Sequence, residues 1–160
     1  MTVRTLVLLR HAKAANPDDY ETDIERPLAP RGHRDAAAAG EWLRAEGLAP
    51  ARVLCSPAVR TRETLDLLDV RPAGGTAFEQ KIYDNDPDLL LSLVAEAPDD
   101  AGTVLLVGHN PSVHQLVHVL TGQAPDRFPT CALAVVGLPG AWADARPGLG
   151  DLAAFRAPKD

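Results

Sequence analysis

Basic side chains follow two apolar runs that lie far apart in the sequence. Arg10 and His11 come directly after TLVLL, and His109 comes after TVLLVG. A folded chain does not leave such groups at the edge of its core without a partner, so the partner lies elsewhere in the chain or in a ligand. Guanidinium groups prefer phosphate oxygens, and a neutral imidazole is a nucleophile near neutral pH. These residue types indicate a phosphate-binding site with a histidine available for attack.

A further basic residue, Arg60, lies in the stretch SPAVRTRETL. Ser56 is a candidate N-cap and Pro57 a candidate first helical residue, so Arg60 is predicted in the first turn of a helix. A cation there opposes the helix dipole unless an anion bridges them, because helix-terminal N–H groups and guanidinium groups both bind phosphate. The alternative interpretation is a surface residue that pairs with Glu63 or Glu25. The sequence leaves both interpretations open.

The elements that would position these residues alternate between strand and helix. Strands are predicted at residues 6–9, 52–55, near 78, 103–109, 131–138 and 151–156, and helices at 31–45, 56–69, 87–97 and 110–120. Continuous apolar runs are typical of strands buried on both faces of a parallel sheet. We therefore expect one domain over residues 1–160, with an α/β fold in three layers (α/β/α) around a mainly parallel sheet. Ligands bind at the carboxyl ends of such strands, so His11 and His109 face one pocket if their strands are neighbours.

The composition restricts the classes of function. The chain has 160 residues and a formal net charge of -6, which argues against general binding to nucleic acid or to an anionic membrane. No apolar stretch is long enough to cross a bilayer, and the first residues lack the features of a signal peptide, so a cytoplasmic protein is expected. Cys55 and Cys131 are too few for a disulfide framework and lack metal-ligand spacing, which favours buried free thiols.

The chain resembles the histidine phosphatase superfamily, whose fold is phosphoglycerate mutase-like, in three motifs that occur in order: LLRHAKA, CSPAVRTRETL and LLVGHNPSVHQLV. The resemblance runs from Leu6 to about Leu138. The short length and the segments ERPLAPRG and FPTCALAVVGL are most similar to the SixA-type phosphohistidine phosphatases. The resemblance implies a phosphatase that needs no metal and no other cofactor.

This resemblance implies a role for each matching residue. His11 is expected to be the nucleophile that takes the phosphoryl group as a covalent phosphohistidine, while Arg10, Arg60 and His109 surround the phosphate oxygens. A cluster of cations stabilises the charge that spreads over the oxygens in phosphoryl transfer. The adjacent arginines would lower the pKa of His11 and keep it unprotonated, whereas His109 would act best protonated, so its environment is expected to differ.

The polar loop NPDDYETDIERPLAP follows the first strand. Asn16 in this loop is expected to contact the substrate. Asp23 and Arg26 also lie near the strand end, but they are interpreted as solvated loop residues. No insertion is long enough to form a lid, so an open and shallow pocket is expected, which suits a protein substrate.

Two features depart from the family pattern. Ala12 replaces the glycine that usually follows the Arg-His pair, so the turn must avoid conformations that only glycine reaches easily. The glutamate that serves many members as general acid has no clear equivalent in FEQKIYDNDPDLL, where Glu79, Asp84 and Asp86 are candidates or solvated residues. An alkyl phosphate needs such an acid more than phosphohistidine does, because protonation of the imidazole assists its departure. The preferred substrate is therefore phosphohistidine on a partner protein, with a small phosphomonoester as the alternative.

Three other interpretations compete with this one. Cys55 and Arg60 suggest a cysteine-dependent phosphatase, but their spacing is C-x4-R where that class needs C-x5-R. His109, His114 and His118 suggest a metal site, but no glutamate lies between His114 and His118 as it does in a zinc protease helix. A phosphate-binding protein without turnover would keep the pocket and hydrolyse nothing.

Overall fold

The apolar segments form one six-stranded sheet in the order β3-β2-β4-β1-β5-β6. The computed structural model describes residues 3–159. Its strands are β1 Val3–Arg10, β2 Arg52–Cys55, β3 Thr76–Phe78, β4 Thr103–Gly108, β5 Leu133–Pro139 and β6 Asp151–Arg156. Its α-helices are α1 Pro30–Ala45, α2 Val59–Leu68, α3 Gln80–Tyr83, α4 Pro87–Ala95 and α5 Ser112–Thr121. Short 3-10 helices lie at Pro17–Asp19, Asp23–Glu25 and Trp142–Asp144.

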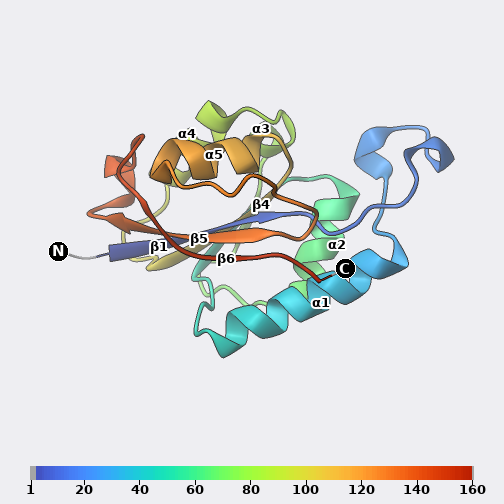
Figure 1. Cartoon of the computed structure of the whole chain (residues 1–160), viewed down its shortest axis with the longest axis horizontal. Helices are drawn as coiled ribbons and strands as arrows, with labels where there is room; N and C mark the ends of the chain where they lie inside the picture. Colours follow the sequence, from blue (N-terminus) through green and yellow to red (C-terminus); the bar gives the residue numbers. More distant parts are fainter. Residues whose placement is uncertain (1–2, 160) are drawn as a thin grey trace.

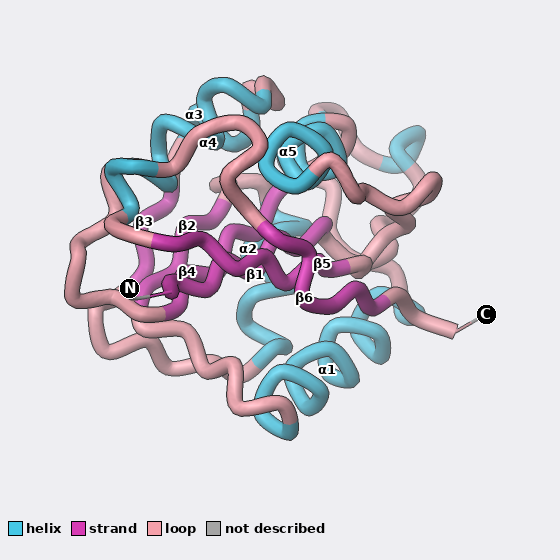
Figure 2. Tube along the Cα trace, turned by 60° about the vertical axis from the view of Figure 1, so that its left-hand side comes forward, coloured by secondary structure: helices cyan, strands magenta, loops and turns pink. Residues whose placement is uncertain are grey.

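The sheet is mainly parallel, as predicted. β1 pairs in parallel with β4, β4 with β2, and β2 with β3, whereas β5 runs antiparallel to both β1 and β6. Helices α1 and α2 cover one face of the sheet, and α3, α4 and α5 cover the other (Figures 1 and 2). The prediction of an α/β fold in three layers is confirmed, with one antiparallel strand next to an edge.

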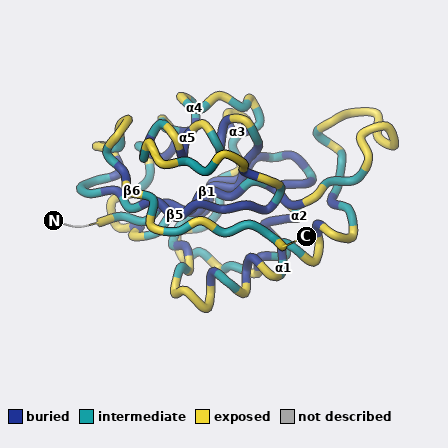
Figure 3. Tube along the Cα trace, in the orientation of Figure 1, coloured by how far each residue is buried: buried dark blue, intermediate teal, exposed yellow. Residues whose placement is uncertain are grey.

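Alternation along the strands divides the core into two layers. In β1, Leu6 and Leu8 pack with residues of α3, α4 and α5, while Val7 and Leu9 pack with residues of α1 and α2. All four side chains are at most 1% exposed. Burial on both faces accounts for the unbroken apolar run. Figure 3 shows the buried positions along the central strands and the exposed positions mainly in loops and on outer helix surfaces.

The carboxyl ends of β1 and β4 lie side by side. Arg10 is the register partner of Gly108, and the next residue, His11, donates its backbone N–H to the Gly108 carbonyl at 3.0 Å. A side chain at position 108 would meet Ile82 and Val113 at 3.0 Å, so glycine permits the close packing of α3 and α5. The chain continues from β1 to α1 on one face and from β4 to α5 on the other (Figure 1). Ligand sites form at such points in α/β sheets.

Two helices begin later than predicted. The predicted start of α2 at Ser56 is wrong: the helix begins at Val59, and the Ser56 hydroxyl is engaged by His109. Asn110 does not cap α5, because its amide donates to a backbone carbonyl elsewhere and the cap position falls on Pro111. Both side chains therefore make a contact far along the chain: Ser56 Oγ accepts from the nearby Ala58 N–H at 3.3 Å and also bonds to His109, while Asn110 bonds to the Phe128 carbonyl.

Short helices were not predicted, among them α3 and the 3-10 helix Trp142–Asp144. Helix α3 has four residues, too few to display a helical period. The 3-10 helix Trp142–Asp144 buries Trp142 completely and lets its indole N–H donate to the Ala101 carbonyl at 2.7 Å, which ties the segment before β6 to the body of the protein. Within residues 3–159, no helix combines the length and the apolar character needed to span a membrane.

Candidate active site

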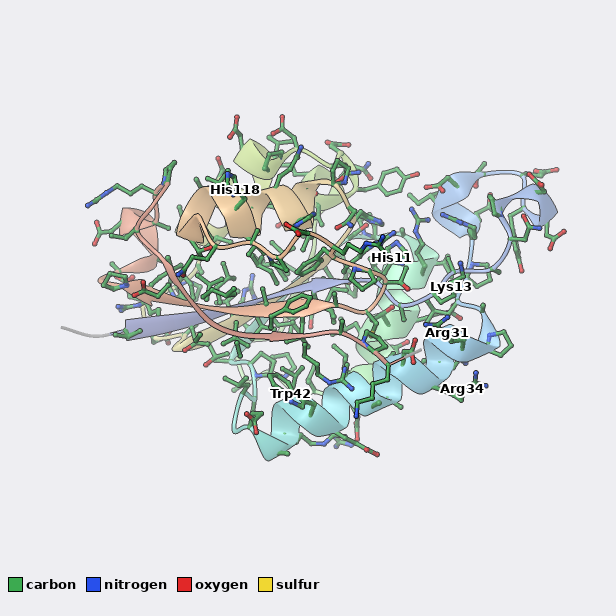
Figure 4. All side chains as sticks on the ribbon, in the orientation of Figure 1. His11, Lys13, Arg31, Arg34, Trp42 and His118 are labelled. Carbon is green, nitrogen blue, oxygen red and sulfur yellow. The ribbon has the colours of Figure 1, made fainter. Side chains whose placement is uncertain are left out.

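A polar cavity of about 330 Å³ opens at the carboxyl ends of β1 and β4. The rings of His11 and His109 lie in it with their centroids 5.3 Å apart. Figure 4 shows His11 at the end of the sheet from which the segment of residues 12–29 extends. The cavity is lined by Arg10, His11, Asp23, Arg26, Arg60, Tyr83, Asn85, His109 and Asn110. The structure thus brings together the four predicted residues Arg10, His11, Arg60 and His109.

The tautomer of His11 is set by the main chain. His11 Nδ1 lies 2.7 Å from the Ala12 carbonyl oxygen, which can only accept, so Nδ1 carries the proton and Nε2 holds the lone pair. Burial is the main cause that lowers the pKa of His11 to about 3. The hydrogen bond to Ala12 raises this pKa, whereas the electrostatic effects of His109 and the neighbouring arginines lower it. A neutral imidazole with one free nitrogen is a nucleophile without further activation.

The ring of His109 is held by Ser56 and Arg60. Arginine can only donate, so His109 Nδ1 accepts from Arg60 Nη2 at 3.4 Å, and the opposite N–H donates to Ser56 Oγ at 2.8 Å. Burial, followed by the charge of Arg60, lowers the pKa of His109 to about 4. In the ligand-free site, burial lowers the pKa of His109 as it does that of His11, so the expected difference in environment does not appear there. A phosphate dianion beside His109 would favour the protonated form.

Three guanidinium groups keep hydrogen-bonding capacity for an anion. The Nε atoms of Arg10, Arg26 and Arg60 are buried, and none of them has a hydrogen-bond partner within residues 3–159. Arg10 Nη1 donates to the Phe128 carbonyl at 3.1 Å, which fixes the direction of the side chain. Arg60 is only 5% exposed, so it is not a surface residue. Buried donors without partners are unfavourable, and a bound oxyanion would satisfy them.

The carboxylate of Asp23 holds Arg60 at the rim of the cavity. Asp23 Oδ2 accepts from Arg60 Nη2 at 2.9 Å and from the Tyr83 hydroxyl at 2.8 Å, and the Asp23 carbonyl accepts from Arg60 Nη1 at 2.8 Å. Asp23 Oδ1 lies 3.3 Å from Arg26 Nη2. Burial raises the pKa of Asp23, but hydrogen bonds from Tyr83 and Arg60 outweigh burial and hold the pKa below its usual value. Asp23 is therefore an ionised partner of Arg60.

Two asparagines connect the cavity to the start of α5. Asn85, in the left-handed region with φ 65°, donates to the Asn110 carbonyl at 2.8 Å and accepts from the Ser112 backbone N–H at 3.1 Å. Asn110 in turn donates to the Phe128 carbonyl at 2.8 Å. Its Oδ1 is buried and has no partner within the described residues. The two amides fix the segment that carries His109.

Other predicted site residues lie outside the cavity. Asn16 does not line the cavity: its side-chain oxygen accepts from a backbone N–H two residues on, and its contact with substrate stays a prediction. Asp84 accepts from a glutamine on α3, Asp86 caps α4, and Glu79 precedes α3 without a side-chain capping bond. Within residues 3–159, Asp23 is the one carboxylate that lines the cavity.

Sequence reasoning missed the roles of several cavity residues. Asp23 and Arg26 were interpreted as solvated, and Tyr83 and Asn85 drew no prediction. Ser56 was assigned to a helix cap. One signal could have identified Asp23 and Arg26: they lie in a polar loop that directly follows a strand ending in Arg-His.

Ala12 fits the turn without strain. Its side chain is fully buried, its backbone is not among the positive-φ residues, and its N–H donates to Thr64 Oγ1 at 3.1 Å. A conformation restricted to glycine is therefore not required after His11. The departure from the family pattern leaves the geometry of the strand end intact.

The competing interpretations find little support in the geometry. Cys55 is buried outside the cavity, and burial raises the pKa of its thiol to about 12, so it is a poor nucleophile. His114 Nε2 donates to the Pro125 carbonyl at 2.6 Å, and the His114 ring stacks on Phe128. In the described part of the chain, no group of three or more His, Cys, Asp or Glu side chains is placed to hold a metal ion.

Comparison with known proteins adds sequence relatives. Residues 6–82 match the model of the histidine phosphatase superfamily, branch 1. An uncharacterized protein of Mycobacterium tuberculosis is 38% identical over 162 residues, which cover 94% of this chain and 100% of that protein. Phosphohistidine phosphatase SixA of Escherichia coli K12 is 31% identical over 137 residues, which cover 82% of this chain and 83% of that protein.

Solved structures of SixA proteins share the fold. SixA from Nakamurella multipartitia superimposes with a TM-score of 0.90 at 35% identity, and the match covers 99% of this chain and 98% of that chain. The protein histidine phosphatase SixA complexed with tungstate superimposes with a TM-score of 0.80 at 27% identity, covering 94% of this chain and 95% of that chain. Sequence and structural similarity therefore agree over nearly the whole chain.

Proposed function

This chain belongs to the histidine phosphatase superfamily, branch 1, and on that premise we propose that it removes phosphate from phosphohistidine in a partner protein through a covalent intermediate on His11. The observation that carries the proposal is the meeting of His11 and His109, with ring centroids 5.3 Å apart, in a cavity lined by three arginines. Tungstate in a related SixA structure is an oxyanion like phosphate, which supports the same ligand class here.

The first step uses the free nitrogen of His11. Its Nε2 lone pair attacks phosphorus, the bond from phosphorus to the substrate nitrogen breaks, and that electron pair returns to the leaving nitrogen. The proton on Nδ1 stays in its hydrogen bond to the Ala12 carbonyl. His11 then carries the phosphoryl group on Nε2 as a cationic ring.

The surrounding cations stabilise the charge on the transferring group. Arg10 and Arg60 line the cavity and offer N–H donors, and their buried Nε atoms have no other partner within the described chain. His109 gains a proton when a dianion binds and then becomes a third donor. Such preorganised donors act most strongly in a site from which water is largely excluded.

The second step releases phosphate to water. A water molecule attacks phosphorus from the side that the leaving group has vacated, and the bond to His11 Nε2 breaks. The electron pair returns to Nε2, while Nδ1 keeps its proton on the Ala12 carbonyl. The water loses its proton to solvent or phosphate, and the neutral nucleophile is restored.

The cavity favours an activated phosphate over an alkyl ester. The one carboxylate that lines it in the described chain is Asp23, whose bonds to Arg60 and Tyr83 keep it ionised and unable to donate a proton. Alkoxide departure gains about 10²–10⁴-fold from a positioned acid, whereas an imidazole carries its own proton. The Escherichia coli relative is a phosphohistidine phosphatase, which agrees with this preference. We further propose a cytoplasmic enzyme that requires no metal or other cofactor.

Trapping of the intermediate tests this function. The protein is mixed with a peptide that carries radiolabelled phosphohistidine and is quenched within one turnover. We expect label on His11 in the wild type and in His118→Ala, a variant of an exposed histidine on α5 (Figure 4), and neither label nor turnover in His11→Ala. Turnover that persists in His11→Ala would exclude the covalent route. Binding of tungstate by a wild type that hydrolyses no activated phosphate would favour a phosphate-binding protein.

A further inference from the structure

Asp23 lies where the leaving group of a phosphoryl transfer would depart. His11 is only 6% exposed and forms the floor of the cavity, while the Asp23 side chain is 51% exposed and lies at the rim. Attack and departure occur on opposite sides of phosphorus. A group attacked by His11 therefore leaves toward the rim, where Asp23 is the one lining carboxylate of the described chain.

The carboxylate keeps an acceptor site for a ligand. Its Oδ2 already accepts from Arg60 Nη2 at 2.9 Å and from the Tyr83 hydroxyl at 2.8 Å, and its Oδ1 accepts from Arg26 Nη2 at 3.3 Å. An ionised carboxylate offers about four lone-pair positions. One position on Oδ1 is left for a donor that enters with the substrate. These partners also fix the carboxylate in place before the substrate arrives.

We propose that Asp23 selects an N-phosphorylated imidazole as substrate by accepting a hydrogen bond from the N–H on its non-phosphorylated ring nitrogen. This inference rests on the proposed function and names the residue that would hydrogen-bond to the leaving group of the substrate. An ester oxygen has no N–H to offer, and the negative charge of Asp23 opposes the alkoxide that forms as an ester leaves.

The step balances without a general acid. The substrate ring enters with phosphorus on one nitrogen and a proton on the other, and is therefore cationic. His11 Nε2 forms the new bond to phosphorus, the old phosphorus–nitrogen bond breaks, and its electrons neutralise the ring, which leaves with its proton in place. Asp23 stabilises the cationic form and accepts from the same N–H throughout. The Ala12 carbonyl accepts the corresponding bond from His11 Nδ1 at 2.7 Å. The substrate imidazole and the His11 ring would thus each have an acceptor at the nitrogen that does not bond to phosphorus.

The experiment compares two substrates in two variants. Asp23→Asn keeps the size of the side chain and removes its charge, and Asp19→Asn makes the same change at an exposed aspartate of the same loop that does not line the cavity. The substrates are a phosphohistidine peptide and p-nitrophenyl phosphate, whose phenolate leaves without a proton. We expect Asp23→Asn to lower kcat/KM for the peptide about 10- to 100-fold more than for p-nitrophenyl phosphate, because a neutral amide oxygen is a weaker acceptor for the cationic ring than a carboxylate. Asp19→Asn should leave the ratio of the two values unchanged.

The outcomes separate the inference from the proposed function. An equal loss on both substrates in Asp23→Asn would mean that Asp23 acts only by positioning Arg60, and would overturn the inference while the function stands. A wild type that hydrolyses p-nitrophenyl phosphate but not the peptide would overturn the proposed function and the inference with it. Thermal unfolding of each variant confirms that the compared proteins are folded.

Discussion

The side chains of Ser56 and His109 are joined by a 2.8 Å hydrogen bond across 53 positions of the sequence. Ser56 follows β2 and His109 follows β4, and these two strands are neighbours in the sheet. The bond aligns the imidazole so that its other nitrogen faces Arg60. A third strand end thus contributes to the site beside those of β1 and β4.

Loss of the Ser56 hydroxyl should loosen His109. Ser56→Ala leaves the His109 N–H buried without a partner, and we expect a loss of about 1–3 kcal/mol in the free energy of unfolding and a lower kcat/KM, by about tenfold. Ser112→Ala is the matched control, because this buried serine donates to the His109 carbonyl at 3.1 Å and not to its ring. Urea unfolding and steady-state kinetics measure the two effects. Equal kinetic losses in the two variants would contradict the role of Ser56.

Removal of one charge-stabilising group should reduce turnover without abolishing it. We expect Arg60→Ala and His109→Ala each to lower kcat/KM by about 10²–10³-fold, as for one donor to a transition-state oxyanion. Arg62→Ala is the control, since Arg62 is exposed on the same helix and lies over the Phe78 ring, 5.0 Å from its centroid. Its activity should remain within about twofold of the wild type. A wild-type rate in Arg60→Ala would remove Arg60 from the reaction.

The stability of the ligand-free protein should fall as the pH is lowered below about 6.5. The pKa of His11 is about 3 and that of His109 about 4 in the folded protein, against an ordinary value of 6.5. Between pH 6.5 and about 4 the unfolded chain binds more protons than the folded one, so the free energy of unfolding rises with pH in this window. Urea unfolding between pH 4.5 and 7 measures the slope. His11→Asn and His109→Asn should each make it shallower, and slopes equal to that of the wild type would show that the histidines titrate normally.

Two glycines of α1 should separate stability from activity. A methyl group on Gly32 would overlap the Lys13 carbonyl, and one on Gly40 would overlap the Leu68 carbonyl. Gly32→Ala and Gly40→Ala should each lose about 1–3 kcal/mol in the free energy of unfolding through overpacking. Only Gly32→Ala should also lower kcat/KM, because Lys13 is two residues from His11. Equal kinetic effects would show that the shift at Lys13 does not reach His11.

The residues at strand ends could be predicted because their positions follow from local pattern. The unbroken apolar runs before Arg10 and before His109 indicate buried parallel strands, and the carboxyl ends of such strands meet at one edge. The burial of Arg60 follows less directly. Arg60 donates to the carbonyl and the carboxylate of Asp23, 37 positions earlier in the chain, and such a contact leaves no local pattern.

The rim of the cavity could not be predicted because it depends on contacts between distant loops. Asp23 and Tyr83 meet at 2.8 Å although 60 positions separate them. Tyr83 is placed by a helix of four residues, which is too short to leave a periodic signal. The side chain of Asn16 forms a local hydrogen bond with the Asp18 backbone N–H, which is the kind of contact that the sequence alone can suggest.

The acceptor for Nδ1 of His11 is a peptide oxygen, and this has an evolutionary consequence. Every amino acid that could replace Ala12 carries the same oxygen, so no point mutation at that position deletes the atom that selects the reactive tautomer. Natural variation there can alter bulk and backbone freedom but leaves the chemical identity of the acceptor untouched. The ring orientation of His11 is thereby shielded from genetic drift in a way that a side-chain acceptor would not allow.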